Sequence, residues 1–173
     1  MNTKLMTALT LLTLLSACMS TAPQLGPDAN AWDDYLSWYK ANPEPMTGDP
    51  TGFLKNVHDG VNAYRNVYVN SIGEAVNKGE QGLPYPEGTI LAKESFNNLD
   101  ALNARRSPDM TLMIKLAAGS SPETGDWEYV LGANGNRRGT GDSGLAAFCR
   151  DCHLFGAAND YSFINSKFFE NNR

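Results

Sequence analysis

The hydrophobic pattern of the chain divides into short segments with the period of a β-strand and a few with the period of a helix. The clearest strand is 65–70, RNVYVN, which has the β-branched and aromatic alternation of a half-buried strand. Three further strands are predicted over residues 89–96, 111–116 and 127–131. Short turn-rich segments separate them, so the pattern predicts an α+β fold, mainly an antiparallel β-sheet with a few short helices.

Helical periodicity is confined to three stretches. The first opens at Pro27 and ends at the two prolines of residues 42–45, and its one-sided stripe of large side chains predicts core packing by Trp32, Tyr35, Leu36 and Tyr39. Residues 71–79 predict a short second helix, and residues 145–152 a third. The segment 132–144 is rich in glycine and asparagine, which predicts a long irregular loop.

The N-terminus has the pattern of an export signal. Lys4 precedes an uncharged run, residues 5–17, that is too short to span a bilayer but suits the core of a signal peptide. The run leads into Leu15-Ser16-Ala17-Cys18, which resembles the lipobox of bacterial lipoproteins, where cleavage precedes a cysteine that becomes acylated. The alternative is an ordinary secretory leader that is cut nearby and leaves Cys18 free.

The lipobox resemblance implies a particular organisation of the chain. Residues 1–17 would be the lipoprotein signal peptide, residues 18–30 a tether with lipid on Cys18, and residues 31–173 the functional domain. Several acyl chains on one residue give durable anchoring to a membrane. Met19 after the cysteine resembles outer-membrane sorting in proteobacterial lipoproteins, so the domain is expected on the periplasmic side of a bacterial membrane, lipid-anchored to the outer membrane.

Composition narrows the class of protein. The chain has 173 residues, of which 42% are hydrophobic and 10% aromatic, values that are ordinary for a globular domain and argue against disorder. Its net charge of -5 at pH 7 argues against a nucleic-acid partner, because binding nucleic acid needs a clustered basic surface.

Two of the three cysteines lie in the motif Cys149-Arg150-Asp151-Cys152-His153. A structural zinc site needs about four ligands, a thioredoxin-like pair lies near the start of a βαβ unit, and a bare disulfide leaves His153 unexplained. A c-type haem accounts for all three residues, since both thiols bond to the haem vinyl groups and the imidazole ligates the iron. The motif therefore predicts one covalently bound haem c, held by Cys149 and Cys152 with His153 as the axial ligand.

Several segments, in this order along the chain, closely resemble the cytochrome P-460 family, which also includes cytochrome c′-beta. They are residues 67–70, residues 85–94, residues 125–127, the haem motif and residues 160–163. The resemblance covers roughly residues 58–165 and leaves the tether and the first helix outside. It implies a five-coordinate monohaem protein, often a homodimer, with a largely antiparallel sheet against the haem.

The resemblance also implies a reaction. In the founding members a lysine, which falls on Lys93 here, is bonded to the porphyrin edge, and hydroxylamine is oxidised to nitrogen oxides. The cytochrome c′-beta branch lacks this cross-link and binds nitric oxide and carbon monoxide. A distal glutamate associated with proton movement in the oxidisers would fall near Thr111, where this chain has none. Asp109 is the nearest carboxylate, and Glu94 points to the opposite face from Lys93 because strand side chains alternate.

Other side chains are candidates for contact with the haem, each beside a plainer role. Arg65 either pairs with a haem propionate or a distal ligand, or is a solvated strand end. Phe163 resembles part of the family's haem pocket, with ordinary packing as its alternative. His58, Met110 and Met113 could each be a sixth iron ligand, although a lone histidine is more often structural and methionines in an apolar strand are usually core.

Three functions therefore stay open. The first is an oxidoreductase acting on hydroxylamine or a related small nitrogen species, which Lys93 favours and the missing glutamate opposes. The second is a non-enzymatic gas binder like cytochrome c′-beta, and the third is an electron carrier with a six-coordinate iron. We favour the enzyme, with a small nitrogen-oxide or gas ligand, a soluble redox partner such as another cytochrome, and the membrane as the expected partners.

Overall fold

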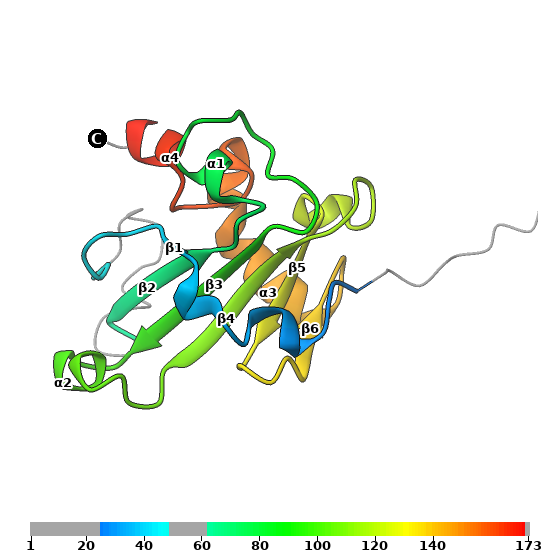
Figure 1. Cartoon of the computed structure of the whole chain (residues 1–173). Helices are drawn as coiled ribbons and strands as arrows, with labels where there is room; N and C mark the ends of the chain where they lie inside the picture. The colour runs from blue at the N-terminus through cyan, green and yellow to red at the C-terminus, as the bar shows by residue number, and fades with distance from the viewer. Residues whose placement is uncertain (1–24, 49–61, 172–173) are drawn as a thin grey trace, which may run out of the picture.

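Six strands form one antiparallel sheet in which each strand pairs with the next along the chain (Figure 1). The strands are β1 Tyr39–Lys40, β2 Tyr64–Val69, β3 Ile90–Phe96, β4 Asp109–Lys115, β5 Trp127–Leu131 and β6 Arg137–Gly139. The computed structural model describes residues 25–48 and 62–171, so the predicted signal peptide, Cys18 and His58 lie outside the described residues. The sheet with its short helices confirms the predicted α+β fold.

Short helical segments connect and cover the strands. The α-helices are α1 Glu74–Asn77, α2 Leu99–Asn103, α3 Gly144–His153 and α4 Ser166–Asn171. The 3-10 helices are η1 Ala29–Trp32, η2 Tyr35–Ser37, η3 Pro122–Thr124 and η4 Leu154–Asn159. Helices α1 and α4 lie at one end of the sheet and α2 at the other (Figure 1). Among the described residues, no helix has the length and apolar character needed to cross a membrane.

Strand β3 shows how the sequence sets the two faces of the sheet. It pairs with β2 on one side and β4 on the other, so it is a central strand. Successive side chains of a strand point to opposite faces, so Leu91, Lys93 and Ser95 lie on one face and Ile90, Ala92 and Glu94 on the other.

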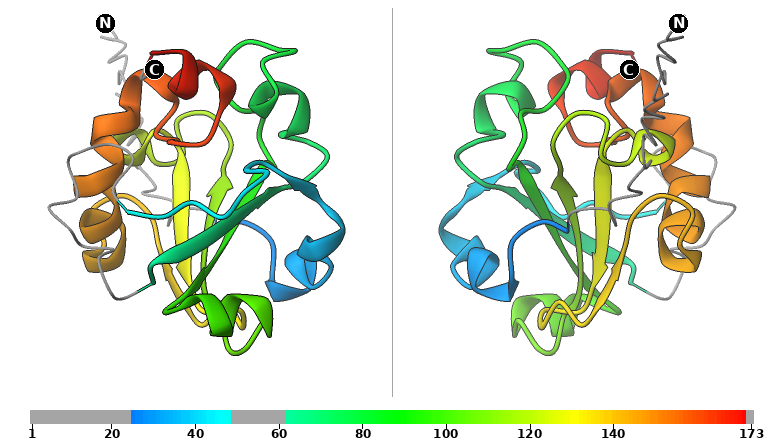
Figure 2. Two further views of the ribbon diagram at one scale, coloured as in Figure 1. Left: turned by 90° about the vertical axis from the view of Figure 1, so that its left-hand side faces the viewer. Right: turned by 90° about the vertical axis from the view of Figure 1, so that its right-hand side faces the viewer.

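Each face of the sheet packs its own apolar cluster beneath a different covering layer. Under α3, the cluster includes Val67, Val69, Leu91, Met113, Trp127, Tyr129 and Ala146. On the other face, the N-terminal segment packs over a cluster that includes Trp32, Ile90, Ala92, Leu112, Ile114 and Val130. Figure 2 shows α3 and the N-terminal segment on opposite sides of the sheet. This layering decides which side chains can share a cavity.

The prediction of a first helix over residues 28–41 is wrong, because the chain there forms η1, η2 and then β1. Trp32 is buried as expected, but Leu36 is 53% exposed and belongs to no helical face. The Asp34 carboxylate accepts hydrogen bonds from the Ser37 hydroxyl at 3.3 Å and the Trp38 indole at 3.1 Å. Such local bonds favour tight turns over a continuous helix, and β1 then pairs with the edge of β2.

The predicted loop 132–144 contains the short strand β6, which its glycine- and asparagine-rich composition did not indicate. Arg138 in β6 lies opposite Val130 of β5, and its guanidinium donates to both carboxylate oxygens of Glu128, at 2.6 and 2.7 Å. The same two side chains hold the N-terminal segment, since Glu128 accepts from the Gly26 amide at 2.8 Å and Arg138 donates to the Pro27 carbonyl at 2.9 Å. Side-chain pairing therefore stabilises a strand of low intrinsic propensity.

Candidate functional site

A cavity of about 330 Å³ lies between the sheet and α3. Its size suits a small-molecule site, since such sites span about 300 to 1,000 Å³. Apolar side chains form part of its wall, among them Val67 of β2, Leu91 of β3, Met113 of β4 and Ile164 of the segment before α4. The cavity also brings together the predicted site residues that the structure describes, Arg65, Lys93, Cys149, Cys152, His153 and Phe163. Residues from distant parts of the sequence thus meet at one place.

Helix α3 presents both thiols of the motif to this cavity. The Ser143 hydroxyl caps the helix by accepting from the Ala146 amide at 3.3 Å, and Gly139 of β6 lies directly below, where a Cβ would come within 2.9 Å of that amide nitrogen. Cys149 and Cys152 are three residues apart, so they lie on one face of the helix. Both thiols are free. Burial raises the pKa of Cys149 to about 11, unlike the lowered pKa of a redox-active thiol pair.

His153 at the end of α3 is oriented as a ligand. Its Nδ1 donates to the Tyr161 carbonyl at 2.6 Å, because a carbonyl can only accept, and this fixes the tautomer with a free lone pair on Nε2. Burial lowers the pKa of His153 to about 4, so the imidazole is neutral near pH 7. The rings of Tyr129 and Phe163 lie beside it at centroid distances of 5.4 and 5.2 Å. A metal ligand needs a neutral imidazole whose orientation and tautomer are fixed by a hydrogen bond at its other nitrogen.

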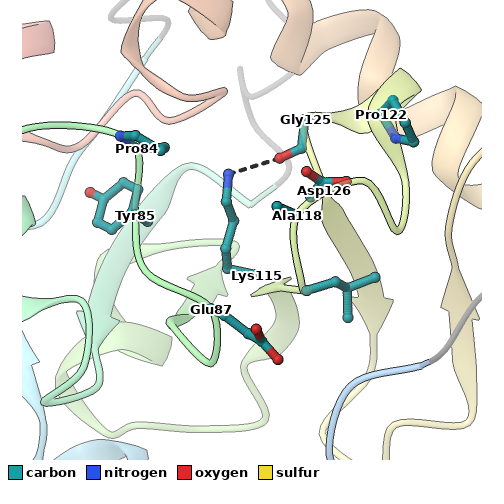
Figure 3. Close-up of a pocket in the computed structure, with 9 residues that line it drawn as sticks. Pro84, Tyr85, Glu87, Lys115, Ala118, Pro122, Gly125 and Asp126 are labelled. Atoms are coloured by element: carbon teal, nitrogen blue, oxygen red, sulfur yellow. Dashed lines mark hydrogen bonds between the residues drawn. The ribbon is translucent and has the colours of Figure 1, made fainter.

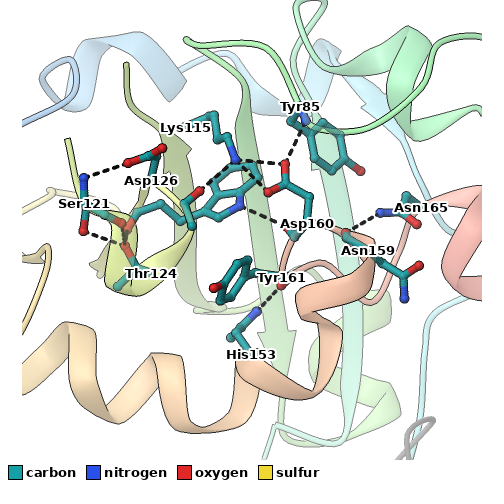
Figure 4. Close-up of polar contacts among 12 residues, drawn as sticks. Tyr85, Lys115, Ser121, Thr124, Asp126, His153, Asn159, Asp160, Tyr161 and Asn165 are labelled. Carbon is teal, nitrogen blue, oxygen red and sulfur yellow. Dashed lines mark hydrogen bonds and ion pairs between the residues drawn. The ribbon is translucent and has the colours of Figure 1, made fainter. Parts of the chain in front are cut away.

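The Tyr161 carbonyl belongs to a turn that is held by side chains from the ends of β4 and β5, on the same face of the sheet as the cavity (Figure 4). The Asp160 carboxylate accepts from Lys115 Nζ at 2.7 and 2.9 Å, and the Asp160 carbonyl accepts from the Trp127 indole at 2.9 Å. Asp160 and Tyr161 both have left-handed backbone, with φ of 54° and 61°. Such conformations cost about 1 to 3 kcal/mol each outside glycine, so the surroundings must maintain them.

Lys93 occupies the face of β3 that the alternation predicts. It lies opposite Val67 of β2 and Thr111 of β4, in the middle of the sheet and not on an edge strand. Burial lowers the pKa of Lys93, and the nearby Arg65 guanidinium lowers it further. The amine is therefore more readily deprotonated, and so more nucleophilic, than that of a surface lysine.

Glu94 lies on the opposite face from Lys93, as predicted. Its buried carboxylate accepts from Arg105, Asn66, Tyr35 and Tyr68, so it belongs to a separate polar network. Thr111 faces Lys93 in the strand register, and the carboxylate of Asp109 lines the cavity two residues away, at an exposed position. The carboxylate available on the cavity side of β4 is therefore exposed, whereas a buried proton relay would need an enclosed one.

The remaining candidates separate by face. Met113 lines the cavity, but Met110 packs in the apolar cluster on the other face, so Met110 is a core residue, the plainer of its two expected roles, and not a candidate iron ligand. Arg65 is only 3% exposed, which excludes a solvated strand end, and it donates to the carbonyls of Asn62 and Gly48. Phe163 lines the cavity beside His153, which is consistent with its predicted place in the pocket.

Comparison with protein families identifies the fold and its site. The model of the cytochrome P460 family matches residues 33–164, about three quarters of the chain. This chain belongs to the cytochrome P460 family. It is therefore a haem cytochrome. A comparison with curated proteins found no match. The family match begins at residue 33, earlier than the resemblance near residue 58 indicated, so η2 and β1 lie within the family and η1 lies just before it.

The cavity of this cytochrome P460 fits a haem. It offers two thiols on one helix face, one imidazole with a free Nε2, and apolar walls. No three His, Cys, Asp or Glu side chains of the described residues lie close enough together to hold a metal ion. Iron bound at His153 would therefore take its other ligands mainly from a macrocycle, which is how haem proteins hold iron.

Tyr129 is a site residue that the sequence did not single out. The residue lines the same cavity, and its buried hydroxyl has no hydrogen-bond partner among the described residues. Buried polar groups are nearly always paired, so the hydroxyl marks a place for a polar atom of the bound group or a water molecule. Its only signal in the sequence is strand alternation, which gives a face but no role.

A second hollow, of about 490 Å³, lies on the surface beside Lys115 (Figure 3). It contains neither a thiol nor an imidazole, and its lining includes Tyr85, Glu87 and Asp126. Its basic group, Lys115, is already bonded to the Gly125 carbonyl and to Asp160. The side chains present therefore favour the cavity under α3 as the functional site.

Proposed function

We propose that this protein is an exported monohaem c-type cytochrome. Its single haem is bonded to Cys149 and Cys152 through thioether links, and His153 supplies the axial iron ligand. Support comes from the three side chains on one cavity wall and from the hydrogen bond that leaves His153 Nε2 free. The predicted signal peptide places the domain outside the cytoplasm, where this kind of attachment occurs.

The reaction that we propose is the oxidation of hydroxylamine or a related small nitrogen species. When bound, the haem supplies the one-electron redox chemistry, and a soluble redox partner such as another cytochrome accepts the electrons. The observation that carries the proposal is the position of Lys93, whose side chain enters the same cavity as the two thiols and His153. Burial lowers the pKa of Lys93, which makes its amine a better nucleophile toward the edge of the macrocycle than that of a surface lysine.

A gas-binding function is the second candidate, because the cavity wall is largely apolar around Val67, Leu91 and Met113 and carries Thr111 where the oxidisers have glutamate. Such a wall suits nitric oxide or carbon monoxide better than a reaction that moves protons. A six-coordinate electron carrier is a weaker alternative, which Met113 alone supports among the described residues. A homodimer, which the family resemblance implies, remains a prediction.

Tryptic digestion of the holoprotein tests the proposed reaction. The haem peptide is expected to contain both the Lys93 segment and the segment 149–153. Lys93→Leu is expected to release the first segment, shift the haem spectrum and abolish hydroxylamine oxidation while nitric oxide binding persists. Lys78→Leu is the matched control, because Lys78 lies on the surface, paired with Glu74, and far from the cavity lining.

The same digestion separates the three functions. A wild-type haem peptide that carries only segment 149–153 would place the protein with the gas binders and refute the enzyme. Because the proposed Lys93 link would by itself retain the haem, the cysteine links are tested in the Lys93→Leu background. The triple variant Lys93→Leu, Cys149→Ala and Cys152→Ala is expected to lose haem to acid-acetone extraction, whereas Lys93→Leu alone retains it and gives a c-type pyridine haemochrome. Haem that stays attached in the triple variant would refute the c-type assignment.

A further inference from the structure

The orientation of His153 depends on a single backbone group. Among the described residues, the hydrogen-bond partner of its imidazole is the Tyr161 carbonyl, 2.6 Å from Nδ1. The neighbouring rings of Tyr129 and Phe163 restrict the imidazole plane but offer it no hydrogen bond. The position of the Tyr161 carbonyl therefore determines both the direction of Nε2 and the strength of the bond at Nδ1.

That carbonyl lies in a turn whose conformation is unfavourable by itself. Asp160 and Tyr161 are successive residues with positive φ, 54° and 61°, a region that a large aromatic residue rarely adopts. The ring of Tyr161 packs against Gly125, where a Cβ would come within 2.2 Å of a ring carbon. Local backbone bonds close the turn, since the Asp160 and Tyr161 amides donate to the carbonyls of Ala157 and Gly156 at 3.1 and 2.8 Å. Contacts from β4 and the β4–β5 connection then hold it against the sheet.

The strongest of these contacts is an ion pair on the far side of the turn (Figure 4). Lys115 Nζ lies 2.7 and 2.9 Å from the two carboxylate oxygens of Asp160, and the two side chains are only 8% and 9% exposed. Lys115 also donates to the Gly125 carbonyl at 2.8 Å, and Asp160 accepts from the Tyr85 amide at 2.8 Å. Neither side chain lines the cavity under α3, so the pair acts on that cavity only through the backbone.

We propose that the Lys115–Asp160 ion pair is a positioning device for His153, and that it sets the strength of the iron–histidine bond by fixing the Tyr161 carbonyl. The inference rests on the proposed role of His153 as the iron ligand. A strong hydrogen bond at Nδ1 makes the imidazole a better electron donor to iron, which stabilises the ferric state. Lys115 and Asp160 are thus positioning residues that never contact the cofactor.

Resonance Raman spectroscopy and redox titration of the ferrous and ferric holoprotein test the proposal. In Asp160→Asn and Lys115→Met, the iron–histidine stretching band is expected to move to lower frequency. The ferrous-to-ferric ratio at a fixed electrode potential is expected to rise, because a weaker hydrogen bond at Nδ1 makes the imidazole a weaker electron donor to ferric iron. Lys115→Arg keeps the cation and is expected to restore the wild-type band.

Arg138→Met is the matched control, because it removes an ion pair with a buried carboxylate from the opposite face of the sheet. It is expected to lower stability without moving the iron–histidine band. If Lys115→Met does not accumulate, Asp160→Asn decides, since asparagine tolerates the left-handed turn. An unmoved band in haem-loaded Asp160→Asn overturns the positioning role and leaves the proposed function intact. A wild type without any iron–histidine band refutes the proposed function itself.

Discussion

At the scale of single residues, the side of the sheet on which a side chain lies decides what it can do. Met110 and Met113 are three positions apart on β4, yet one packs beneath the N-terminal segment and the other lines the cavity. Lys93 and Glu94 are adjacent and are likewise divided between the cavity and a separate polar network. The type of residue therefore makes it a candidate ligand, and its place in the alternation of the strand determines whether it can reach the iron.

The ferrous holoprotein is expected to be high-spin and to bind carbon monoxide or nitric oxide readily. Met113 packs within the apolar cluster of Val67 and Leu91, so its sulfur serves as core and not as a committed ligand. Met113→Ala should therefore leave the spin state unchanged, although it lowers stability by about 2 to 5 kcal/mol. Absorption spectra with and without carbon monoxide provide the measurement.

Met110→Ala is the control for this prediction, since it removes a methionine of the same strand from the other face. A wild-type spectrum that is low-spin, and that becomes high-spin only in Met113→Ala, would support the electron carrier and contradict the open iron.

At the scale of elements, a buried carboxylate joins η2, the sheet and the segment after α2. Glu94 accepts hydrogen bonds from Arg105 at 2.6 and 3.0 Å, and from Asn66, Tyr68 and Tyr35. Burial raises the pKa of Glu94, but the hydrogen bonds from Arg105 and Asn66 outweigh it and hold the pKa below its ordinary value. The network therefore stabilises the fold when Glu94 is ionised.

Arg105→Met is expected to destabilise the protein by about 1 to 2 kcal/mol at pH 7. This loss of stability is at the lower end of the range for a charged hydrogen bond, because the Arg105 side chain is 42% exposed. A carboxylate with a lowered folded pKa stabilises above its unfolded pKa and loses that contribution as the pH falls through the folded pKa. Without Arg105 the folded pKa rises, so the acid loss of stability should begin at a higher pH.

Urea unfolding at a series of pH values between 3 and 7 measures this effect. Arg106→Met is the matched control, because Arg106 is the exposed neighbour and makes no side-chain bond to Glu94 among those described. Acid unfolding curves that coincide for Arg105→Met and the wild type would contradict the stabilising role of the pair.

Elements with a strong periodic signal were predicted well from the sequence. The strand predicted over 127–131 coincides with β5, and the predicted helix over 145–152 lies within α3. The two elements that were predicted wrongly depend on contacts that no local sequence pattern reveals. Strand β6 depends on the pairing of Arg138 with Glu128, and the first segment follows the hydrogen bonds of Asp34 and the edge of β2.

The candidate site likewise contains residues that the sequence predicted and residues that it did not. The spacing of Cys149, Cys152 and His153 predicted their chemistry, the family resemblance singled out Lys93, and the structure brings all four side chains to one cavity. The residues that hold the turn behind His153 were not predicted, because Lys115 and Asp160 are 45 positions apart and no spacing rule connects them. Tyr129 was missed because a tyrosine in a strand is ordinary until the structure shows its buried hydroxyl without a partner in the described part of the chain.

At the scale of the whole molecule, the protein is expected to be anchored to a membrane through Cys18. Native protein should partition into the membrane fraction, and Cys18→Ser should release it or leave it unprocessed, because the lipid attaches to that thiol. Haem content should be the same in both forms, since the haem motif lies in a separate part of the chain. A soluble wild type with an unmodified Cys18, shown by mass spectrometry, would contradict the anchor.

The contact of Gly26 with Glu128 limits how such an anchored domain can turn. Gly26 follows Cys18 by eight positions, a stretch that reaches at most about 30 Å when fully extended. A domain of this size is roughly 40 Å across. Gly26 packs near Ile114 on the face opposite the cavity, so a connection this short would keep that face toward the lipid if Cys18 is acylated. The mouth of the cavity would then open to the aqueous compartment, where small substrates and redox partners diffuse.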